Sequence, residues 1–572
     1  MSKVTITTKV LTASSPEHPP RAAVGYTGSV KIQLSQDQNF ITGVTYTSAL
    51  VPNEYGYIRT TIEGLQSNTQ YYARIASYDG TTADNNTIAK FKTPPSGNHS
   101  FKFGFGSCLQ NKQYNGGQAR VLRNIKQKAE TGDIEFFYML GDWDYNDIAT
   151  NDVNLFYDSY HERFNGTTAS RALGFYSSKD CWASMPLYYI NDDHDSGPDN
   201  GYKDSPAKVA AIATFRDVVP GPTLANLSGI TSGVYYSFTR GRIRFVATDN
   251  RNERTQDPSV SNPKRPNDES QYILSTQQEQ WFKDQISQAA TGGQAIIWVN
   301  SIAWIGPGAA TGAPDDPRPS GATYDYDIKR EWNGYVGRDF DTGATLGITY
   351  DFVTTGARDI WGTRELQRER IANHIIGLTM NDRIVIISGD MHALAFDDGY
   401  EHNGDGSYKL DGSGNRIKNR NNHATLKVCH SSPLTQAAPP APYTFFQDPY
   451  TISLAEEYIG DPIGSGYTGY AWVEPAALNT RGGPYYIGPL RSWTNRLSPE
   501  YDPGDPMYDP YLSFAESYAT MEVTDAGGTT IGFRFKGYML DTNYSSVANH
   551  LAGLTHPEIL VIDKSWTIGL TA

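Results

Sequence analysis

The chain has 572 residues, about four times the ~150 residues of a typical domain, so more than one folding unit is expected. Hydrophobic residues make up 38% and charged residues 19%, which excludes a collagen-like, coiled-coil or wholly disordered chain. The net charge of −14 disfavours binding to nucleic-acid backbones or anionic lipids. An anionic substrate would therefore need another source of attraction, such as a bound metal ion.

Three cysteines are too few for a disulfide framework, and both a Cys181–Cys429 bridge and unpaired thiols stay open. The first residues read as a strand without a basic or apolar leader, so an export signal is either absent or already removed. No apolar run approaches the ~18 residues that span a bilayer. We therefore expect a soluble chain.

Residues 1–97 differ from the rest of the chain. Short alternating runs are separated by turn residues about every ten positions, which is typical of a β-sandwich. The runs are Ser29–Leu34, Ile41–Thr47, Tyr55–Ile62, Tyr71–Tyr78 and Ile88–Phe91. Leu65–Tyr71 resembles the fibronectin type III turn in which a tyrosine hydroxyl closes the last corner. Pro94–Gly97 then reads as a linker, which divides the chain into domains at 1–97 and 98–572, the first a spacer without chemistry.

From Phe101 the pattern changes to strand, helix, strand, with helices expected at Gly117–Glu130, Ser275–Gln288 and Arg364–Leu378. Several apolar strands stop where metal-binding residue types begin. They are Phe101–Phe105 before Cys108, Ile134–Leu140 before Asp142, Pro186–Ile190 before Asp192–Asp195, Ala295–Val299 before Asn300, and Arg383–Ser388 before Asp390 and His392. Because loops at the carboxyl ends of strands converge in α/β sheets, we expect these side chains to share one site.

Three of these strand ends carry the chemistry. Gly141–Tyr145 holds a carboxylate and a phenol three residues apart, and a carboxylate can bridge two metal ions. Asp192–Asp195 surrounds one histidine with acids, although a solvated acidic turn is an equally common explanation. Gly389–His392 places a carboxylate and an imidazole on the same side of an extended segment. Each motif alone is weak evidence, and their order along the chain is stronger.

That order resembles the PhoD-like alkaline phosphatases, a branch of the calcineurin-like metallophosphoesterases. The resemblance covers about residues 100–435 and includes quieter motifs. These motifs are Asp249–Arg254, Leu274–Trp281, Trp332–Tyr335 and Ser431–Leu434. The resemblance implies an α/β fold, a four-layered α/β/β/α sandwich, preceded by a small all-β domain of fibronectin or immunoglobulin type.

The resemblance also implies the site residues. The first metal ion would be held by Cys108, Asp142, Tyr145 and His392. Asp142 would bridge to a second ion, whose other ligands would be Asp193, Asp390 and, with the least certain motif, Asn300.

The donor types suggest which metals bind. Thiolate, phenolate and carboxylate offer three formal negative charges, so Fe³⁺ is favoured over Zn²⁺ at the first site. The second site is all oxygen, which suits Ca²⁺, Mn²⁺ or Mg²⁺ better than Zn²⁺.

Two such ions would activate a water for attack on phosphorus and neutralise the phosphoryl oxygens. His194 would protonate or stabilise the leaving oxygen. The expected activity is hydrolysis of phosphomonoesters, and the expected partner is a small phosphoester substrate. Two segments, 305–360 and 433–515, are expected to shape access to the metals.

Other interpretations remain. Family members often have Asp-Asp-His-Glu, whereas the last acid here is Asp195, which leaves a phosphodiesterase or phospholipase D-like activity open. Asp249 and Arg251 either orient substrate phosphate or form a salt bridge, so they are left out of the site. A non-catalytic, extracellular calcium-dependent adhesion or carbohydrate-binding protein is a second alternative. A glycosidase ranks last, because it does not explain Cys108, Tyr145 and His392.

No nucleic-acid-binding surface and no transmembrane segment are expected, and the oligomeric state is unknown. An extracellular or periplasmic location is expected, with the cytoplasm left open.

Overall fold

The computed structural model describes residues 2–10, 28–80, 82–84, 87–109, 120–143, 145–165, 178–222, 224–225, 233–256, 269–304, 361–390, 394–400, 408, 410–418, 422–432, 434, 436–437, 470–471, 485–486, 491–492, 514–515, 517–540 and 558–570. The expected access segment 305–360, the Trp332–Tyr335 motif and most of 433–515 lie outside the described residues. Within the described ranges, no helix combines the length and apolar character needed to cross a membrane.

The N-terminal residues form two small sheets around their own core. A four-stranded sheet has the order β3-β2-β5-β6, and β1 pairs with β4 in a second sheet. The strands are β1 Ser2–Lys9, β2 Val30–Ser35, β3 Thr45–Tyr46, β4 Tyr57–Leu65, β5 Gln70–Ser77 and β6 Ala89–Lys92. Ile32, Leu34 and Phe91 are buried between them. The Tyr71 hydroxyl accepts the Gln66 N–H at 3.0 Å, so the expected tyrosine corner is confirmed.

The strand expected at Ile41–Thr47 is largely wrong, because only Thr45 and Tyr46 belong to a strand. The Asp37 carboxylate accepts the backbone N–H groups of Asn39 at 3.0 Å and Ile41 at 2.9 Å. A side chain that binds the backbone in this way replaces the ladder hydrogen bonds of a strand by a turn.

Two large sheets form the centre of the molecule. Within the described residues one has the strand order β23-β22-β21-β7-β8-β9 and the other β10-β11-β12-β13-β15-β14-β18. The first comprises β7 Phe101–Gly106, β8 Phe137–Met139, β9 Leu187–Tyr189, β21 Ser517–Thr524, β22 Thr530–Leu540 and β23 Glu558–Gly569. The second comprises β10 Tyr236–Arg240, β11 Ile243–Ala247, β12 Ala295–Val299, β13 Ile384–Ser388, β14 Leu394–Asp397, β15 Lys427–Ser431 and β18 Tyr485–Tyr486. Strands β7, β8 and β9 are mutually parallel, as are β11, β12, β13 and β15.

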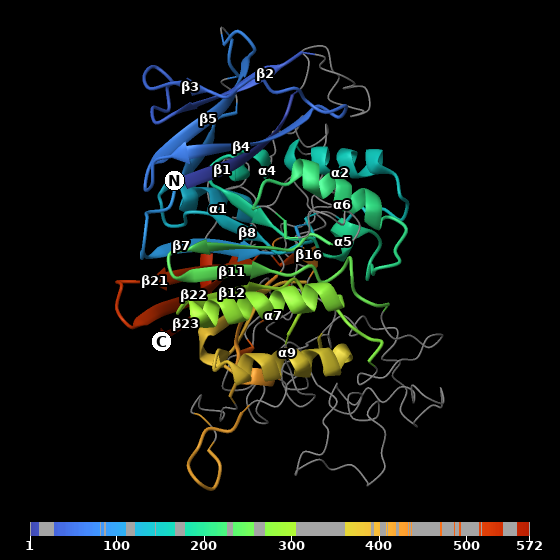
Figure 1. Ribbon diagram of the computed structural model, residues 1–572, viewed down its shortest axis with the longest axis vertical. Coiled ribbons are helices and arrows are strands. Elements are labelled where there is room, and N and C mark those ends of the chain that lie inside the picture. The colour runs from blue at the N-terminus through green and yellow to red at the C-terminus, as the bar shows by residue number, and fades with distance from the viewer. Residues whose placement is uncertain are drawn as a thin grey trace, which may run out of the picture.

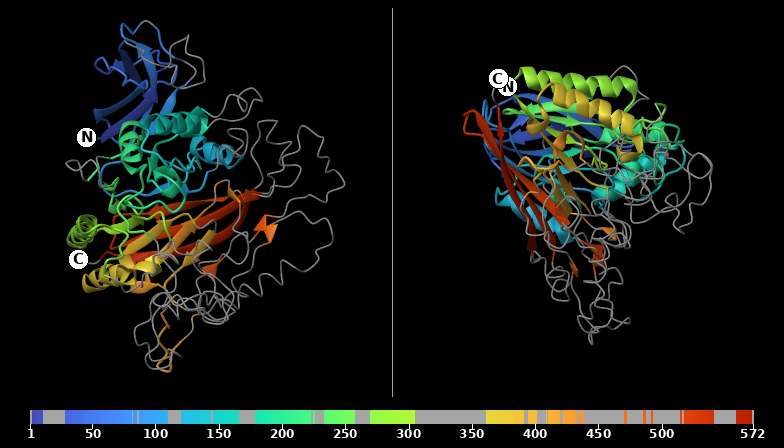
Figure 2. Two further views of the ribbon diagram at one scale, coloured as in Figure 1. Left: turned by 90° about the vertical axis from the view of Figure 1, so that its right-hand side faces the viewer. Right: turned by 90° about the horizontal axis from the view of Figure 1, so that it is seen from below.

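Helices lie on both sides of these sheets (Figure 1). They are α1 Arg120–Glu130, α2 Val153–Asn165, α4 Ser178–Trp182, α5 Asp193–Ser196, α6 Lys208–Val218, α7 Thr276–Thr291 and α9 Glu365–Gly377. In Figure 1, α1, α2, α4 and α6 lie between the N-terminal strands and the sheets, and α7 and α9 lie on the opposite side. In the left view of Figure 2, the red C-terminal strands cross the middle of the molecule, between the blue N-terminal strands and the yellow helix α9. The remaining short elements are β16 Gln436–Ala437, β17 Tyr470–Ala471, β19 Arg491–Ser492, β20 Phe514–Ala515 and the 3₁₀ segments Trp361–Arg364, Asn381–Arg383 and His423–Thr425.

Strand β12 shows why its residues form a fully buried strand, and its bounds match the predicted ones. Ile296 and Trp298 pack with Phe282 of α7 in one core. Ala295, Ile297 and Val299 point to the other face and pack in a core shared by both large sheets. Since side chains alternate along a strand, a strand covered on both faces is apolar throughout.

All three cysteines are buried and free, so the bridge left open between Cys181 and Cys429 does not form. Cys181 lies among the residues of α1, α2 and α4, whereas Cys429 lies in the core between the two sheets. They therefore belong to different cores, and the third cysteine, Cys108, has its Sγ 3.4 Å from Asp142 Oδ2.

A buried carboxylate, Glu253, joins the loop after β11 to the start of α7. Its Oε2 accepts hydrogen bonds from Ser275 Oγ at 2.7 Å and from Gln278 Nε2 at 2.7 Å. Ser275 also caps the helix, because its Oγ accepts the N–H of Gln278 at 3.2 Å. Burial raises the pKa of Glu253 to about 7, although the hydrogen bonds from Ser275 and Gln278 oppose the rise.

We expect Glu253 to make the protein less stable at alkaline pH. Its pKa is raised from 4.5 to about 7 in the folded state, so its contribution to stability is complete below about pH 4.5 and is lost as the pH rises from there through about 7. Glu253→Gln keeps an oxygen for Ser275 and Gln278 and should abolish this loss, which amounts to at most about 3 kcal/mol. Urea unfolding at about pH 4 and about pH 8, on either side of this range, measures it. Identical pH dependence in both proteins would contradict the assignment.

Candidate metal centre

Strands β7, β8 and β13 end in residues with an uncommon backbone conformation. Cys108, Asp142 and Asp390 have φ values of 61°, 53° and 72°. Residues with a Cβ rarely adopt this left-handed region, and such strain is typical of functional sites. The three ends are hydrogen-bonded to one another: the Leu109 N–H donates to the Asp142 carbonyl at 2.7 Å, and the Asp390 N–H donates to Ser107 Oγ at 2.9 Å.

The conformation of Asp390 corrects one prediction. The expected extended segment at Gly389–His392 does not hold at Asp390, because its φ of 72° is outside the strand region. The period-two argument therefore does not place the Asp390 carboxylate, and the hydrogen bond from the Asp390 N–H to Ser107 fixes the backbone at this position instead. His392, a predicted ligand, lies outside the described residues.

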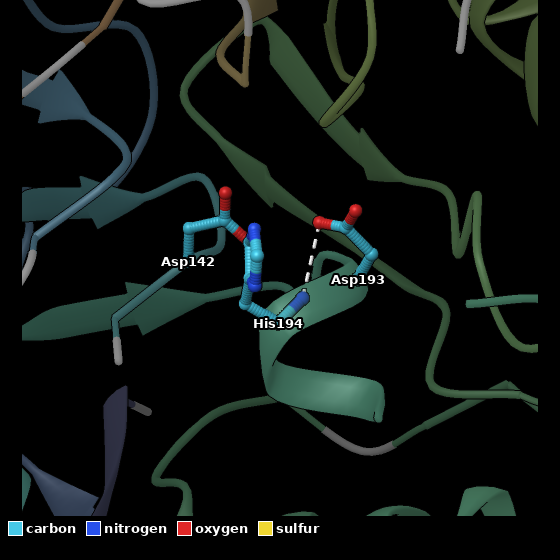
Figure 3. A group of neighbouring side chains, drawn as sticks. All are labelled: Asp142, Asp193 and His194. Carbon is cyan, nitrogen blue, oxygen red and sulfur yellow. Dashed lines mark hydrogen bonds between the residues drawn. The ribbon is translucent and has the colours of Figure 1, made fainter. Parts of the chain in front are cut away.

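Four carboxylates converge beyond these strand ends. Oxygen atoms of Asp142, Asp192, Asp193 and Asp390 all lie within 4.8 Å of one another, and Asp142, Asp193 and His194 form an overlapping group. Figure 3 shows the second group, with the Asp142 and Asp193 carboxylates on either side of His194. Asp142, Asp192 and Asp193 are at most 2% exposed, so the interpretation as a solvated acidic turn is wrong.

Asp192 was not among the predicted ligands. It lies three residues after the end of β9 and one position before Asp193, which begins α5. The adjacent pair of aspartates at a predicted strand end was the available signal, since both side chains of such a pair can turn towards the site when a helix begins between them.

Asp142 provides the clearest test of whether these residues fit a cation. Its Oδ1 is buried and accepts no hydrogen bond from any described residue. Burial, together with the charges of Cys108 and Asp193, raises the pKa of Asp142 well above its ordinary value. A metal ion would coordinate this buried oxygen, which has no hydrogen-bond partner among the described residues, and would neutralise the repulsion between the like charges around it. The residues present therefore fit a cation.

Cys108 and Tyr145 lie beside the other Asp142 oxygen. The Cys108 Sγ is 3.4 Å and the Tyr145 hydroxyl 3.3 Å from Asp142 Oδ2. Burial, and secondarily the charge of Asp390, raises the pKa of the Cys108 thiol to about 12. The thiol is therefore protonated at neutral pH unless a cation deprotonates it.

Asp193 differs from Asp142 although both are buried. Burial alone would raise its pKa, but the charges of Arg251 and His194 and the N–H of Asn200, at 2.7 Å, hold the pKa of Asp193 below its ordinary value. Asp193 is thus an ionised donor at neutral pH.

His194 is held between a carboxylate and a ring. Its Nδ1 lies 2.5 Å from Asp147 Oδ1, and its ring centroid lies 4.1 Å from that of Tyr145. Burial would lower its pKa, but the charge of Asp193 and the contact with Asp147 raise the pKa of His194 to about 9. Asp147 was not predicted, and its place two residues beyond Tyr145 gave no signal of this contact.

Asn300 is fully buried at the end of β12, as predicted for a residue near the site. Its Oδ1 accepts hydrogen bonds from Asn250 Nδ2 and from Trp361 Nε1, the latter at 3.1 Å. In this arrangement the amide oxygen is hydrogen-bonded to two other side chains, which it would have to release in order to bind a cation.

A family model described as PhoD-like phosphatase matches residues 103–410, more than half of the 572-residue chain. The chain belongs to the PhoD-like phosphatase family. Family membership and the acidic cluster together support a metal-dependent phosphoesterase.

No curated protein matches the sequence. A solved structure titled "Structure of PhoD" is 15% identical with a TM-score of 0.60, covering 99% of this chain and 88% of that chain, and it shows the fold alone. A dimetal phosphatase from Danio rerio is 10% identical with a TM-score of 0.25, covering 58% of this chain and 87% of that chain, a likeness too weak to support an argument.

In this PhoD-like phosphatase, the Asp195 carboxylate accepts hydrogen bonds from the backbone of the loops that carry the acidic cluster. Its Oδ2 accepts the N–H groups of Asp142 at 2.6 Å and Asp192 at 3.0 Å, and its Oδ1 accepts the Trp143 N–H at 3.2 Å. Arg163 pairs with it at 2.9 Å, and both side chains are buried. Asp195 therefore positions two cluster loops through their backbone.

Gly141 is tightly packed against Asp192 in the PhoD-like site. Its φ is 101°, and an added Cβ would lie 2.3 Å from Asp192 Cβ and 2.8 Å from Asp192 N. We expect Gly141→Ala to lower the free energy of unfolding by about 3 kcal/mol or more and to weaken cation binding, because Asp192 must move.

Gly132→Ala is the matched control for Gly141→Ala. Gly132 has a φ of 77°, but nothing lies within 4 Å of an added Cβ. Its substitution should cost only about 1 kcal/mol of backbone strain and leave Mn²⁺ binding unchanged. Urea unfolding and calorimetric titration with Mn²⁺ measure both variants, and equal effects would contradict the packing argument.

Proposed function

We propose that this PhoD-like phosphatase hydrolyses phosphomonoesters at a two-cation centre. The observation that supports this proposal is the convergence of four carboxylates, three of them almost fully buried, from different strand ends, beside a thiol, a phenol and a histidine. A net charge of −14 makes such a cation site the means of attracting an anionic substrate.

The proposed ligands divide into two sets. Cys108, Asp142, Tyr145 and, outside the described residues, His392 would hold Fe³⁺, a hard trivalent ion that anionic donors neutralise. Asp142, Asp193, Asp390 and Asn300 would hold Ca²⁺, or alternatively Mn²⁺, Mg²⁺ or Zn²⁺. Asp192 adds a further carboxylate to the second set. When bound, the two ions would supply charge neutralisation for the phosphoryl oxygens and an activated water.

The protein's own residues would position the reaction and move a proton. The His194 imidazole, raised to a pKa of about 9, carries a proton at neutral pH and can give it to the leaving oxygen. Asp147 at Nδ1 orients the ring, so the other nitrogen, 3.7 Å from the exposed Asp199, would be the one that donates to a substrate. Asp195 and Arg163 hold the backbone of the Asp142 loop in place.

The proposal extends to the architecture. We propose the four-layered α/β/β/α sandwich for residues 98–572 and a separate fibronectin-like domain for 1–97. The two cores of the large sheets and the independent core of the N-terminal strands support this division. Contacts join the two parts: Arg59 Nε donates to the Val219 carbonyl at 3.2 Å at the end of α6.

Turnover of an aryl phosphate and of a bis-aryl phosphate, with elemental analysis and a visible spectrum, tests the proposed function. We expect the monoester to react faster, a chelator to stop the reaction, and a charge-transfer band from Tyr145 or Cys108 bound to Fe³⁺. A strong diester preference would replace the monoesterase by a phosphodiesterase. Failure to hydrolyse either compound would favour a calcium-dependent binding protein.

A further inference from the structure

Arg251 is a buried cation at the centre of the acidic cluster. Its Nε donates to Asp192 Oδ1, and its Nη2 lies 3.3 Å from Asp390 Oδ2 and 3.7 Å from Asp193 Oδ1. The arginine side chain is fully buried. A single guanidinium thus contacts three of the four cluster carboxylates.

These contacts connect the two large sheets. Arg251 follows β11 and Asp390 follows β13 in one sheet, whereas Asp192 and Asp193 follow β9 in the other. The carboxylates reach the cluster from different sheets, and the guanidinium is the group that they share. Its planar fork of donors suits this task better than a single ammonium would.

The loop that carries Arg251 is held firmly in place. Asp249 Oδ1 accepts the N–H groups of Arg251 at 3.1 Å and Asn252 at 2.9 Å, and Asp249 Oδ2 accepts the Val234 N–H at 2.7 Å. The expected salt bridge is therefore present, but with the cluster carboxylates rather than with Asp249. Asp249 instead shapes the backbone that delivers the guanidinium.

A direct contact with substrate phosphate does not fit this position. A residue that binds an incoming anion needs donors turned towards the entry, whereas Arg251 is 0% exposed and its side chain is turned to carboxylates of the chain itself. Without it, several buried negative charges would face one another before any metal ion arrived.

We propose that Arg251 is a positioning residue, a permanent cation of the centre that holds Asp192, Asp193 and Asp390 together in the metal-free protein, ready for a metal ion. This inference rests on the proposed function, since it takes the cluster as a cation site. It predicts that the metal-free protein depends on Arg251 more than the metal-loaded protein does, because a bound cation takes over the neutralisation of the carboxylates.

The melting temperatures of Arg251→Gln in chelator and in saturating Mn²⁺ test the proposal. We expect a loss of about 5 °C or more in chelator and a clearly smaller loss with Mn²⁺, so that the shift caused by Mn²⁺ exceeds that of the wild type. Arg251→Lys keeps the charge without the planar fork of donors, so its melting temperature in chelator should lie between those of Arg251→Gln and the wild type. If Arg251→Gln fails to fold in chelator, its refolding on addition of Mn²⁺ supports the proposal.

Arg368→Gln is the matched control. Arg368 of α9 is equally buried, but its Nη1 donates to the Trp304 carbonyl at 3.0 Å on the helix-covered side of the seven-stranded sheet. Its loss should lower the melting temperature equally with and without Mn²⁺. If both Arg251 variants also showed the same loss of melting temperature with and without Mn²⁺, the inference would be overturned and the proposed function would still stand. A wild-type protein that neither responds to Mn²⁺ nor hydrolyses phosphoesters would overturn the proposed function itself.

Discussion

Asp142→Asn is expected to lower kcat/KM for an aryl phosphate by about a thousandfold or more and to reduce the metal content of the purified protein. Asp142 belongs to both groups of candidate ligands, and its Oδ2 lies beside Cys108 and Tyr145. The amide keeps the size of the side chain but removes the charge that two cations would share. Steady-state kinetics and elemental analysis of the same preparation measure the two effects.

The stability of metal-free Asp142→Asn should not fall together with its activity and metal content. Burial and neighbouring charges raise the pKa of Asp142, so the metal-free fold is strained by this carboxylate, and the amide should leave its melting temperature unchanged or higher. Asp133→Asn is a suitable control. Asp133 does not belong to the cluster, its side chain is 40% exposed, and its Oδ1 lies 2.5 Å from Lys102 Nζ. Full metal content and activity in Asp142→Asn would contradict the proposed centre.

His194→Ala is expected to lower kcat by about a hundredfold to ten-thousandfold for an alkyl phosphate, and much less for a nitrophenyl phosphate. A poor leaving group needs the proton of His194, whereas nitrophenolate leaves without it. Asp147→Asn should give a smaller loss of about tenfold with the same dependence on leaving group, because the ring remains but its orientation is no longer held. The metal content of both variants should equal that of the wild type.

Asp199→Asn provides the control for these two variants. Asp199 lies 3.7 Å from the other ring nitrogen, and its side chain is 68% exposed, so its removal should change kcat little. Since His194 also lies near Asp142 and Asp193, a role as ligand is the competing interpretation. An equal loss for both leaving groups, accompanied by loss of metal, would show that His194 binds the cation.

The sequence was sufficient to predict which strand ends meet. Apolar runs such as Ala295–Val299 are visible because a strand buried on both faces contains no polar residue. Asp142 and Asp193 follow from that pattern, since the parallel strands β8 and β9 end at one edge, and Asp390 joins them from the end of β13 in the other large sheet. Their convergence in the described structure agrees with this prediction, although the ligand roles themselves stay proposals.

The partners of these residues could not be predicted in the same way. Asp147, Asp195 and Arg251 act through contacts with side chains or N–H groups in other loops, and no periodicity marks such contacts. The left-handed backbone of Cys108 and Asp142 was equally hidden, because the sequence marks such positions only when they carry glycine.

Helices α2 and α6 were also not predicted. Both helices pack their aromatic residues, such as Tyr157 and Phe215, against the outer face of β8 and β9. Tertiary burial rather than a strong amphipathic pattern therefore stabilises them.

The pairing of β21 with β7 has a consequence for biosynthesis. Ala519 lies opposite Phe105, so the strand that leads to Cys108 obtains one neighbour from a part of the chain translated much later. Until Ser517–Thr524 emerges from the ribosome, the nascent chain exposes β7 as an unpaired, aggregation-prone edge. This phosphatase is thus expected to complete its catalytic unit only once β21 has been translated, and this long-range pairing should slow its folding.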